Sequence, residues 1–165
     1  MDFSKVPPEA LEAACERGTE VHDLSAAYAQ RLWISEISER SAGFYQSFVR
    51  WFDAYVVEVH LVEERIDHEK LLYTGQLDLL ITIKGDRGPS LWDLKTGALA
   101  LPWWPLQVAA YDALARYRGF SPIRRGSIRL HPQGKMPKLS EYTGSLAQDF
   151  NIFLSALNVF RFFNP

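Results

Sequence analysis

The chain has 165 residues, a hydrophobic content of 47% and a formal net charge of −2 at pH 7. This length and composition predict one globular domain, residues 1–165, and exclude a disordered chain. The single cysteine, Cys15, excludes an internal disulfide framework and a four-cysteine metal cluster. The overall charge does not indicate a nucleic-acid binder, so such binding would depend on a local patch or a bound metal.

Targeting and membrane signals are absent from the sequence. No segment is long and apolar enough to be expected to cross a membrane, and residues 1–18 lack the apolar run of a signal peptide. We therefore expect a cytoplasmic protein without a membrane partner, in which Cys15 stays reduced.

The spacing of apolar and turn-forming residues predicts alternating helices and strands. In chain order these are a helix over 9–33 that breaks or bends at Gly18, a helix over 44–52, strands over 55–66, 77–83 and 90–95, a helix over 105–117, strands over 127–131 and 138–142, and a helix over 145–162. The last helix is expected to bury its apolar stripe, which consists of Phe150, Phe153, Leu154, Leu157 and Phe160. This order predicts an α/β domain.

The most informative segment is residues 75–111, where two acidic residues and a lysine lie on adjacent predicted strands. Asp93 and Lys95 are two residues apart, so their side chains point to the same face. If Asp78 lies opposite on the neighbouring strand, three charged groups converge. Charges taken out of water are costly unless they are paired or bound to a metal. The pattern indicates either a structural ion pair or a functional site.

A glutamine and a tyrosine follow directly on the next predicted helix. Gln107 and Tyr111 are four residues apart and therefore share a helix face. The pair alone is weak evidence, but it comes directly after the Asp-x-Lys strand.

These motifs resemble the PD-(D/E)XK nuclease superfamily. The segments GQLDLL, WDLKTG and QVAAYD match, in order, the pattern G-x-x-D, D/E-x-K-T and Q-x-x-x-Y of its RecB-type exonuclease branch. Residues 17–22 resemble the branch's glycine-then-histidine helix, and residues 62–68 resemble its acidic strand. Glu63 is the preferred acidic match, with Glu58 and Glu64 as competitors. The resemblance implies a restriction-endonuclease-like core, with a central mixed β-sheet flanked by α-helices.

The resemblance implies a site for Mg²⁺ or Mn²⁺, which are hard cations that oxygen ligands suit. Asp78 and Asp93 would be the main ligands. His22 would join them and shift the preference toward Mn²⁺, although a half-buried structural histidine is the alternative. Glu63 would complete or tune the site.

The same resemblance implies catalytic roles around this metal site. Lys95 would orient the attacking water or offset charge on the transition-state phosphate. Gln107 and Tyr111 would position Lys95 or the DNA strand.

A basic segment follows the motif region. Residues 113–140 contain no acidic residue and seven cations, which are Arg116, Arg118, Arg124, Arg125, Arg129, Lys135 and Lys138. Without counter-acids, they are expected near the active site, where Arg116, Arg124 and Arg125 would hold the phosphate backbone. The alternative is an ordinary solvated edge. Trp103 is a candidate to stack on an end base.

The function implied is a metal-dependent DNA exonuclease that hydrolyses phosphodiester bonds in phage or prokaryotic recombination or repair. It would be a stand-alone nuclease, because the sequence has no helicase-type phosphate loop. DNA would be its substrate, and a single-strand-binding or recombination protein its partner. Two alternatives are a structure-specific endonuclease on flapped or branched DNA and a catalytically silent nucleic-acid-binding subunit.

Overall fold

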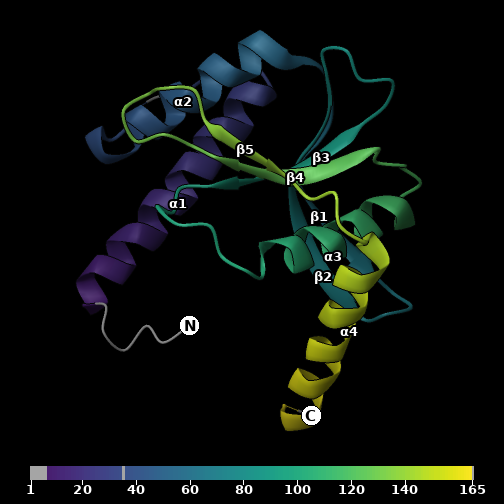
Figure 1. The fold of residues 1–165 in the computed structure, drawn as a ribbon. Coiled ribbons are helices and arrows are strands. Elements are labelled where there is room, and N and C mark those ends of the chain that lie inside the picture. The colour runs from purple at the N-terminus through teal and green to yellow at the C-terminus, as the bar shows by residue number, and fades with distance from the viewer. Residues whose placement is uncertain (1–6, 35, 165) are drawn as a thin grey trace.

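The structure, a computed structural model, describes residues 7–34 and 36–164. The predicted single domain also includes residues 1–6, 35 and 165, which lie outside this part. The elements, in chain order, are α1 (Pro8–Ala29), α2 (Glu39–Tyr55), β1 (Val56–His68), β2 (Tyr73–Ile83), β3 (Ser90–Lys95), α3 (Trp104–Tyr117), β4 (Arg124–Arg129), β5 (Lys138–Glu141) and α4 (Leu146–Phe163). Figure 1 shows their arrangement around one sheet.

The described strands form one mixed sheet in the order β1-β2-β3-β4-β5. Strands β3 and β4 are parallel, and the other neighbouring pairs are antiparallel. The α/β class and the central mixed sheet flanked by helices are therefore confirmed. The parallel pair requires a crossover connection, which α3 provides.

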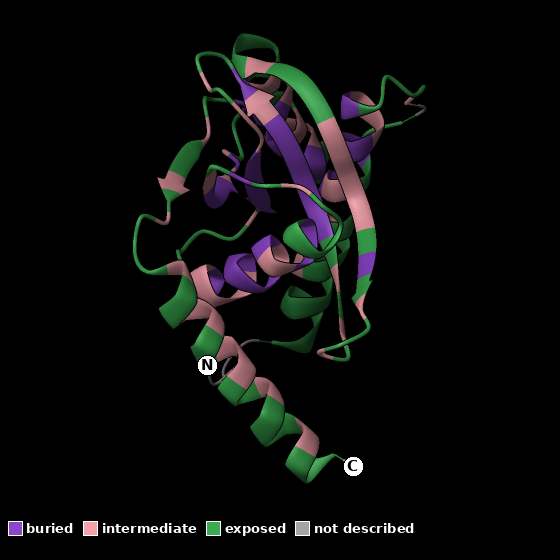
Figure 2. Ribbon diagram, turned by 90° about the vertical axis from the view of Figure 1, so that its right-hand side faces the viewer, coloured by how far each residue is buried: buried purple, intermediate pink, exposed green. Residues whose placement is uncertain are grey.

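Two apolar clusters hold the helices to the sheet. In one cluster, Val21 of α1 and Phe48 and Trp51 of α2 pack with residues of β2, β3 and β4. In the other, Val108 and Leu114 of α3 pack with residues of the first three strands. Helix α4 packs on α3. Figure 2 shows the buried residues gathered along the middle of the sheet and the inner faces of these helices.

Helix α1 differs from the prediction in two ways. It runs unbroken through Gly18, so the predicted break is wrong, and it ends at Ala29 rather than Trp33. One glycine costs a helix only about 1 kcal/mol, and tertiary packing readily offsets this cost. The actual end comes where Arg31 takes a left-handed φ of 58°. The unbroken helix matters because it carries His22.

Helix α4 is the second correction. None of its residues is buried. The predicted core stripe is at best half-buried, and Phe160 is 63% exposed. The reason is that α4 packs on one side only, and much of its length extends beyond the body of the domain (Figure 2). No helix in the described residues is long and apolar enough to cross a membrane.

Candidate metal centre and active site

Three acidic residues occupy one row across β1, β2 and β3. The β1–β2 pairing continues on both sides of Glu63 and places it opposite Asp78. Extending the β2–β3 pairing by one residue past Leu79 and Trp92 places Asp78 opposite Asp93. The predicted convergence of Asp78 with the Asp93–Lys95 strand is therefore present, and a third carboxylate joins it from β1.

His22 reaches two of these carboxylates from α1. Its Nδ1 lies 3.0 Å from Oε1 of Glu63 and 3.4 Å from Oδ1 of Asp78. One ligand atom from each of the three residues lies within 4.8 Å of the others. Neighbouring ligands of an octahedral Mg²⁺ lie about 3.0 Å apart, because each bond is about 2.1 Å long. This group could hold a divalent cation without a large rearrangement.

The group strongly favours positive charge at its centre. Burial disfavours the charged form of His22, but the hydrogen bonds that Asp78 and Glu63 accept from it, together with their negative charges, outweigh burial and raise the pKa of His22 to about 10. Two carboxylates that share one imidazole therefore require a cation between them. A protonated His22 would supply that cation in the metal-free protein, and a metal ion would satisfy the same demand.

The remaining oxygens of the two carboxylates are held by the protein. Oδ2 of Asp78 accepts a hydrogen bond from the main-chain N–H of Leu94 at 2.6 Å, and Oε2 of Glu63 accepts one from Gln76 at 2.6 Å. Glu63 also has a left-handed φ of 47°. Such a backbone costs about 1–3 kcal/mol in a non-glycine residue. These contacts leave Oε1 and Oδ1 directed at the shared point.

Lys95 belongs to a second, connected chain of polar contacts. Its Nζ lies 2.6 Å from Oδ2 of Asp93 and donates to Oε1 of Gln107 at 3.0 Å. Gln107 in turn donates to the hydroxyl of Tyr111 at 2.9 Å. The Trp104 ring lies under the ammonium, 5.5 Å from its centroid. The structure thus brings together all three motifs of the segment 75–111, with Gln107 and Tyr111 fixing the position of Lys95.

Asp93 pairs with Lys95 and lies outside the group formed by His22, Glu63 and Asp78. It is 1% exposed. Burial and the charge of Asp78 raise the pKa of Asp93 to about 7, although Lys95 opposes the shift. Its Oδ2 makes the charge contact with Lys95 but no well-aligned hydrogen bond to any described residue. Of the expected metal ligands, His22 and Asp78 therefore lie together, and Glu63 rather than Asp93 is their third member.

The three glutamates of β1 have different surroundings. Glu63 faces the site, whereas Glu64 pairs with Arg118 at 3.4 Å. The side chain of Glu58 is 65% exposed and lies 3.8 Å from His60. The preference for Glu63 over its two competitors agrees with this geometry.

Gly75, the first residue of the GQLD motif, allows α3 to approach β2. A Cβ at this position would lie 2.9 Å from Cε1 of Tyr111 and 2.8 Å from Cδ1 of Leu114. Any other residue would displace the Tyr111 ring or the helix. Close packing against α3 therefore explains the glycine at position 75, and it affects the site through Tyr111.

The expectation that the basic segment lacks counter-acids is wrong. Four of its cations pair with acidic residues, all of which lie outside the segment: Arg116 with Asp112, Arg118 with Glu64, Arg124 with Asp86, and Arg125 with Asp149. The acidic partner of Arg116 lies one helical turn before it, just outside the segment. The sequence run is basic, but the surface it joins is mixed.

Arg125 is the clearest case. It is 5% exposed, and besides Asp149 it donates to the carbonyl oxygens of Pro105 and Gly144. This residue ties β4 to the start of α3 and to α4, so its buried guanidinium faces these protein partners rather than solvent. Arg116 and Arg124 are more exposed but are also engaged in ion pairs.

A different basic groove lies beside the site. A cavity of about 490 Å³ is lined by residues just after the end of β3, by cations of α1, β4 and β5, and by apolar side chains. Its polar lining includes Arg17, Thr96, Arg129, His131 and Lys138. Arg129 pairs with Lys95 in the parallel register. Nε of Arg17 is buried and has no hydrogen-bond partner among the described residues. In the sequence, the only sign of this groove was Arg17, which lies five residues before His22 on the same helix. Sequence spacing could not show that Arg17 lies close to the cations of β4.

An apolar pocket lies on the other side of the Lys95 chain. It has a volume of about 530 Å³ and is lined by residues of β2, α3 and α4, including Tyr73, Trp103, Leu106, Gln107, Tyr111 and Phe153. Trp103 is therefore close to the site, whereas Trp104 is buried against it.

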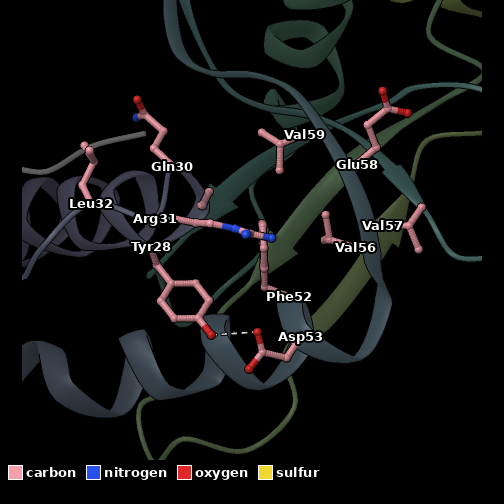
Figure 3. A pocket seen from close by; sticks show the side chains of 11 residues that line it. Tyr28, Gln30, Arg31, Leu32, Phe52, Asp53, Val56, Val57, Glu58 and Val59 are labelled. Carbon is pink, nitrogen blue, oxygen red and sulfur yellow. Dashed lines mark hydrogen bonds between the residues drawn. The ribbon is translucent and has the colours of Figure 1, made fainter.

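A further cavity of about 650 Å³ lies apart from this centre, between the ends of α1 and α2 and the start of β1 (Figure 3). There Tyr28 donates a hydrogen bond to Asp53 at 2.7 Å. Glu58 is the one predicted acidic candidate that lines it. The cavity shares no residue with the His22 group or the Lys95 chain.

Comparisons with known proteins add no assignment. No protein-family model matches the sequence, and no curated protein matches it significantly.

Proposed function

We propose that this protein is a metal-dependent DNA exonuclease with a restriction-endonuclease-like core, acting in the cytoplasm on phosphodiester bonds. One observation carries the proposal: a ligand group of His22, Glu63 and Asp78 lies beside a lysine that is held by Asp93 and Gln107. A cation site next to a fixed ammonium suits a reaction in which negative charge builds on a phosphate.

The donor set supports Mg²⁺ or Mn²⁺ as the cofactor. Two carboxylates and one imidazole bind such hard or borderline ions well, and the imidazole favours Mn²⁺. His22, Glu63 and Asp78 would hold the ion, with Asp93 next to it. When bound, the metal would activate a water and neutralise charge on the phosphate.

The chain's own residues account for the remaining chemistry. In the hydrolysis, a water oxygen forms a bond to phosphorus, one phosphorus–oxygen bond to a sugar breaks, and the departing oxygen takes up a proton. Lys95 places its ammonium against the phosphate oxygens. Asp93 and Gln107 keep Lys95 in place, and Tyr111 fixes the amide of Gln107.

The basic groove supports nucleic acid as the substrate. Its cations begin next to Lys95, where Arg129 pairs with that residue in the sheet. In place of Arg124 and Arg125, we assign the contacts with the phosphate backbone to Arg17, Arg129 and Lys138. A single-strand-binding or recombination protein remains the proposed partner in phage or prokaryotic DNA metabolism.

A silent nucleic-acid-binding subunit is the weaker alternative. Asp93 is buried with a raised pKa, so its charge opposes folding. A domain without catalysis gains nothing from such a residue. An endonuclease on flapped or branched DNA would use the same residues, and only the substrate distinguishes it.

The deciding experiment combines three forms of DNA with three metal conditions. Linear single strands, linear duplexes and closed circles are incubated with Mg²⁺, Mn²⁺ or chelator, and the products are resolved on denaturing gels. An exonuclease degrades linear DNA and spares circles, whereas cleavage of circles or flaps identifies the endonuclease. Binding without cleavage in either metal would overturn the proposal.

Glu63→Gln and Glu64→Gln form a matched pair of variants on neighbouring positions. Glu63→Gln should reduce activity at low Mn²⁺ by at least about 10- to 100-fold, since even groups that only support a metal ligand have effects of that size. Glu64→Gln should change it less than twofold, because that side chain contacts Arg118 at the surface. Equal effects of the two changes would contradict the assigned ligand group.

A further inference from the structure

The apolar pocket beside Tyr111 has walls from three elements. Tyr73 comes from β2, Trp103 and Leu106 lie at the start of α3, and Phe153 and Ala156 come from α4. Trp103 is 37% exposed. The rings of Tyr73 and Phe153 meet edge to face, with centroids 5.1 Å apart. The pocket therefore offers aromatic surface.

This pocket is continuous with the candidate active site. Gln107 and Tyr111 line it and also belong to the hydrogen-bonded chain that ends at Lys95. A group held in the pocket is thus separated from the Lys95 ammonium by a single side chain. Its occupant must be part of the same molecule whose phosphate lies at Lys95, or a close neighbour of it.

The lining decides what kind of group fits. None of the described lining residues is charged, so a phosphate would have no partner there. A flat ring with polar edges suits the lining better, because it can stack on Trp103 while Thr74 and Gln107 offer hydrogen bonds. Aromatic side chains beside a nucleic-acid backbone site bind bases in this manner.

Helix α4 gains a role from this pocket. It buries none of its own residues, yet it is held against the β1–β2 turn by Arg161, which donates to the carbonyl oxygens of Leu71 and Leu72. In this position its residues Phe153 and Ala156 close the outer side of the pocket. The helix therefore completes a cavity instead of contributing to a core.

We propose that this pocket takes one unpaired nucleobase next to the scissile phosphate, and that the substrate is consequently single-stranded DNA or a frayed end. The inference rests on the proposed nuclease function. A base inside a duplex is stacked and paired, and its removal from the duplex costs energy that an unpaired strand does not spend. The basic groove would hold the DNA backbone, and the apolar pocket would select single-stranded over double-stranded DNA.

The test measures coupling between a protein change and a substrate change. Trp103→Ala is combined with a single-stranded oligonucleotide in which an abasic site is moved through each position. With the intact strand, Trp103→Ala should raise KM by roughly 5- to 150-fold, the range of stacking losses, with kcat within about threefold. One abasic position should reproduce this loss with the wild-type protein and add nothing with Trp103→Ala.

Two further variants control the result. Phe153→Ala, on the opposite wall, should show the same loss and the same coupling. Trp33→Ala removes another exposed tryptophan, on the segment after α1, and should leave KM unchanged. Additive losses at every abasic position, or equal KM values for single strands and blunt duplexes, would overturn the inference.

Binding separates this inference from the proposed function. Fluorescence anisotropy of labelled oligonucleotides, with Ca²⁺ in place of Mg²⁺, measures binding without cleavage. It gives four affinities: wild type and Trp103→Ala, each with the intact strand and with the abasic strand. If the effects of Trp103→Ala and the abasic site on binding are coupled but neither Mg²⁺ nor Mn²⁺ supports cleavage, the base pocket is supported and the nuclease function is refuted. Cleavage without such coupling would support the nuclease function and refute the base pocket.

Discussion

Two ion pairs of this domain invite comparison, because each is formed by a carboxylate and a cation with an N···O contact of 2.6 Å. One is Lys95–Asp93 on β3, and the other is Arg125–Asp149 between β4 and α4. Besides Asp149, the guanidinium of Arg125 donates to the main-chain carbonyl oxygens of Pro105 and Gly144. Asp93 instead has an Oδ2 without a hydrogen-bond partner among the described residues, and burial and the charge of Asp78 raise its pKa to about 7. The Arg125–Asp149 pair is satisfied by further hydrogen bonds, whereas the Lys95–Asp93 pair is strained, because its buried carboxylate carries an unfavourable charge.

The difference teaches how to separate a structural ion pair from a functional one. A buried pair with all bonds made serves to join elements, and the loss of one partner harms the fold. A buried carboxylate placed beside a second carboxylate opposes folding, so its retention indicates another use. The basic segment made Arg125 look functional in the sequence, but its burial and its bonds to Asp149 and two main-chain carbonyls indicate a structural role.

The largest expected effect is on catalysis at the strained pair. Asp93→Asn should lower the single-turnover cleavage rate by about 10³-fold, because Lys95 loses the carboxylate that positions it and the metal loses a neighbouring charge. The fold should be retained, since an unfavourable buried charge is removed. Cleavage assays beside thermal melts followed by circular dichroism test both parts. A folded Asp93→Asn protein with normal turnover would refute the site.

The satisfied pair should show the opposite result. Arg125→Met should lower the free energy of unfolding by about 3 kcal/mol, because Asp149 and two carbonyls lose their donor. Urea titration measures this loss. The remaining folded protein should keep its kcat, because Arg125 does not contact the candidate site. A loss of kcat without a loss of stability would restore Arg125 as a substrate contact.

The two regions should also differ in their pH dependence. In metal-free protein the pKa of Asp93 is raised from 3.8 to about 7, so its stabilising contribution is full below pH 3.8 and lost as the pH rises through 7. The pKa of His22 is raised from 6.5 to about 10, so its contribution is full below pH 6.5 and lost as the pH rises through 10. Stability should therefore fall with rising pH over both windows.

Thermal melts in chelator across this pH range check the sign. Asp93→Asn should flatten the lower window, and His22→Gln should flatten the upper one, each by an amount on the order of a few kcal/mol. Arg125→Met should shift the whole curve downward without changing its shape above about pH 6, because arginine does not titrate there. Increasing stability of the wild-type protein between pH 7 and 10 would contradict this reading.

The smallest expected effect concerns the support of Lys95. Gly75→Ala should reduce turnover by about tenfold, because the new methyl would come within 2.9 Å of the Tyr111 ring and disturb the chain to Gln107. Mn²⁺ affinity, measured by calorimetry, should change little. Gly144→Ala is the control, since a Cβ there meets no atom within 4 Å. Identical turnover for Gly75→Ala and wild type would show that Tyr111 does not support Lys95.

Local patterns in the sequence determined the elements and the polar face of β3. Strand β3 has the bounds that its apolar run and flanking turn residues predict, and Asp93 and Lys95 share a face because side chains alternate along a strand. Gln107 and Tyr111 meet because residues four apart on a helix are neighbours. These relations depend only on nearby residues and on backbone geometry, so they can be read from the sequence.

Tertiary structure decided every relation between distant segments. The choice of Glu63 over Glu58 and Glu64 depends on the β1–β2 register and on a left-handed backbone at Glu63. Its contact with His22 joins residues 41 positions apart. Three of the four counter-acids of the basic segment come from distant parts of the chain. Helix α4 stays exposed because none of the described elements packs on its outer side. A sequence carries charge and hydrophobicity, but their partners depend on packing, which only the folded chain supplies.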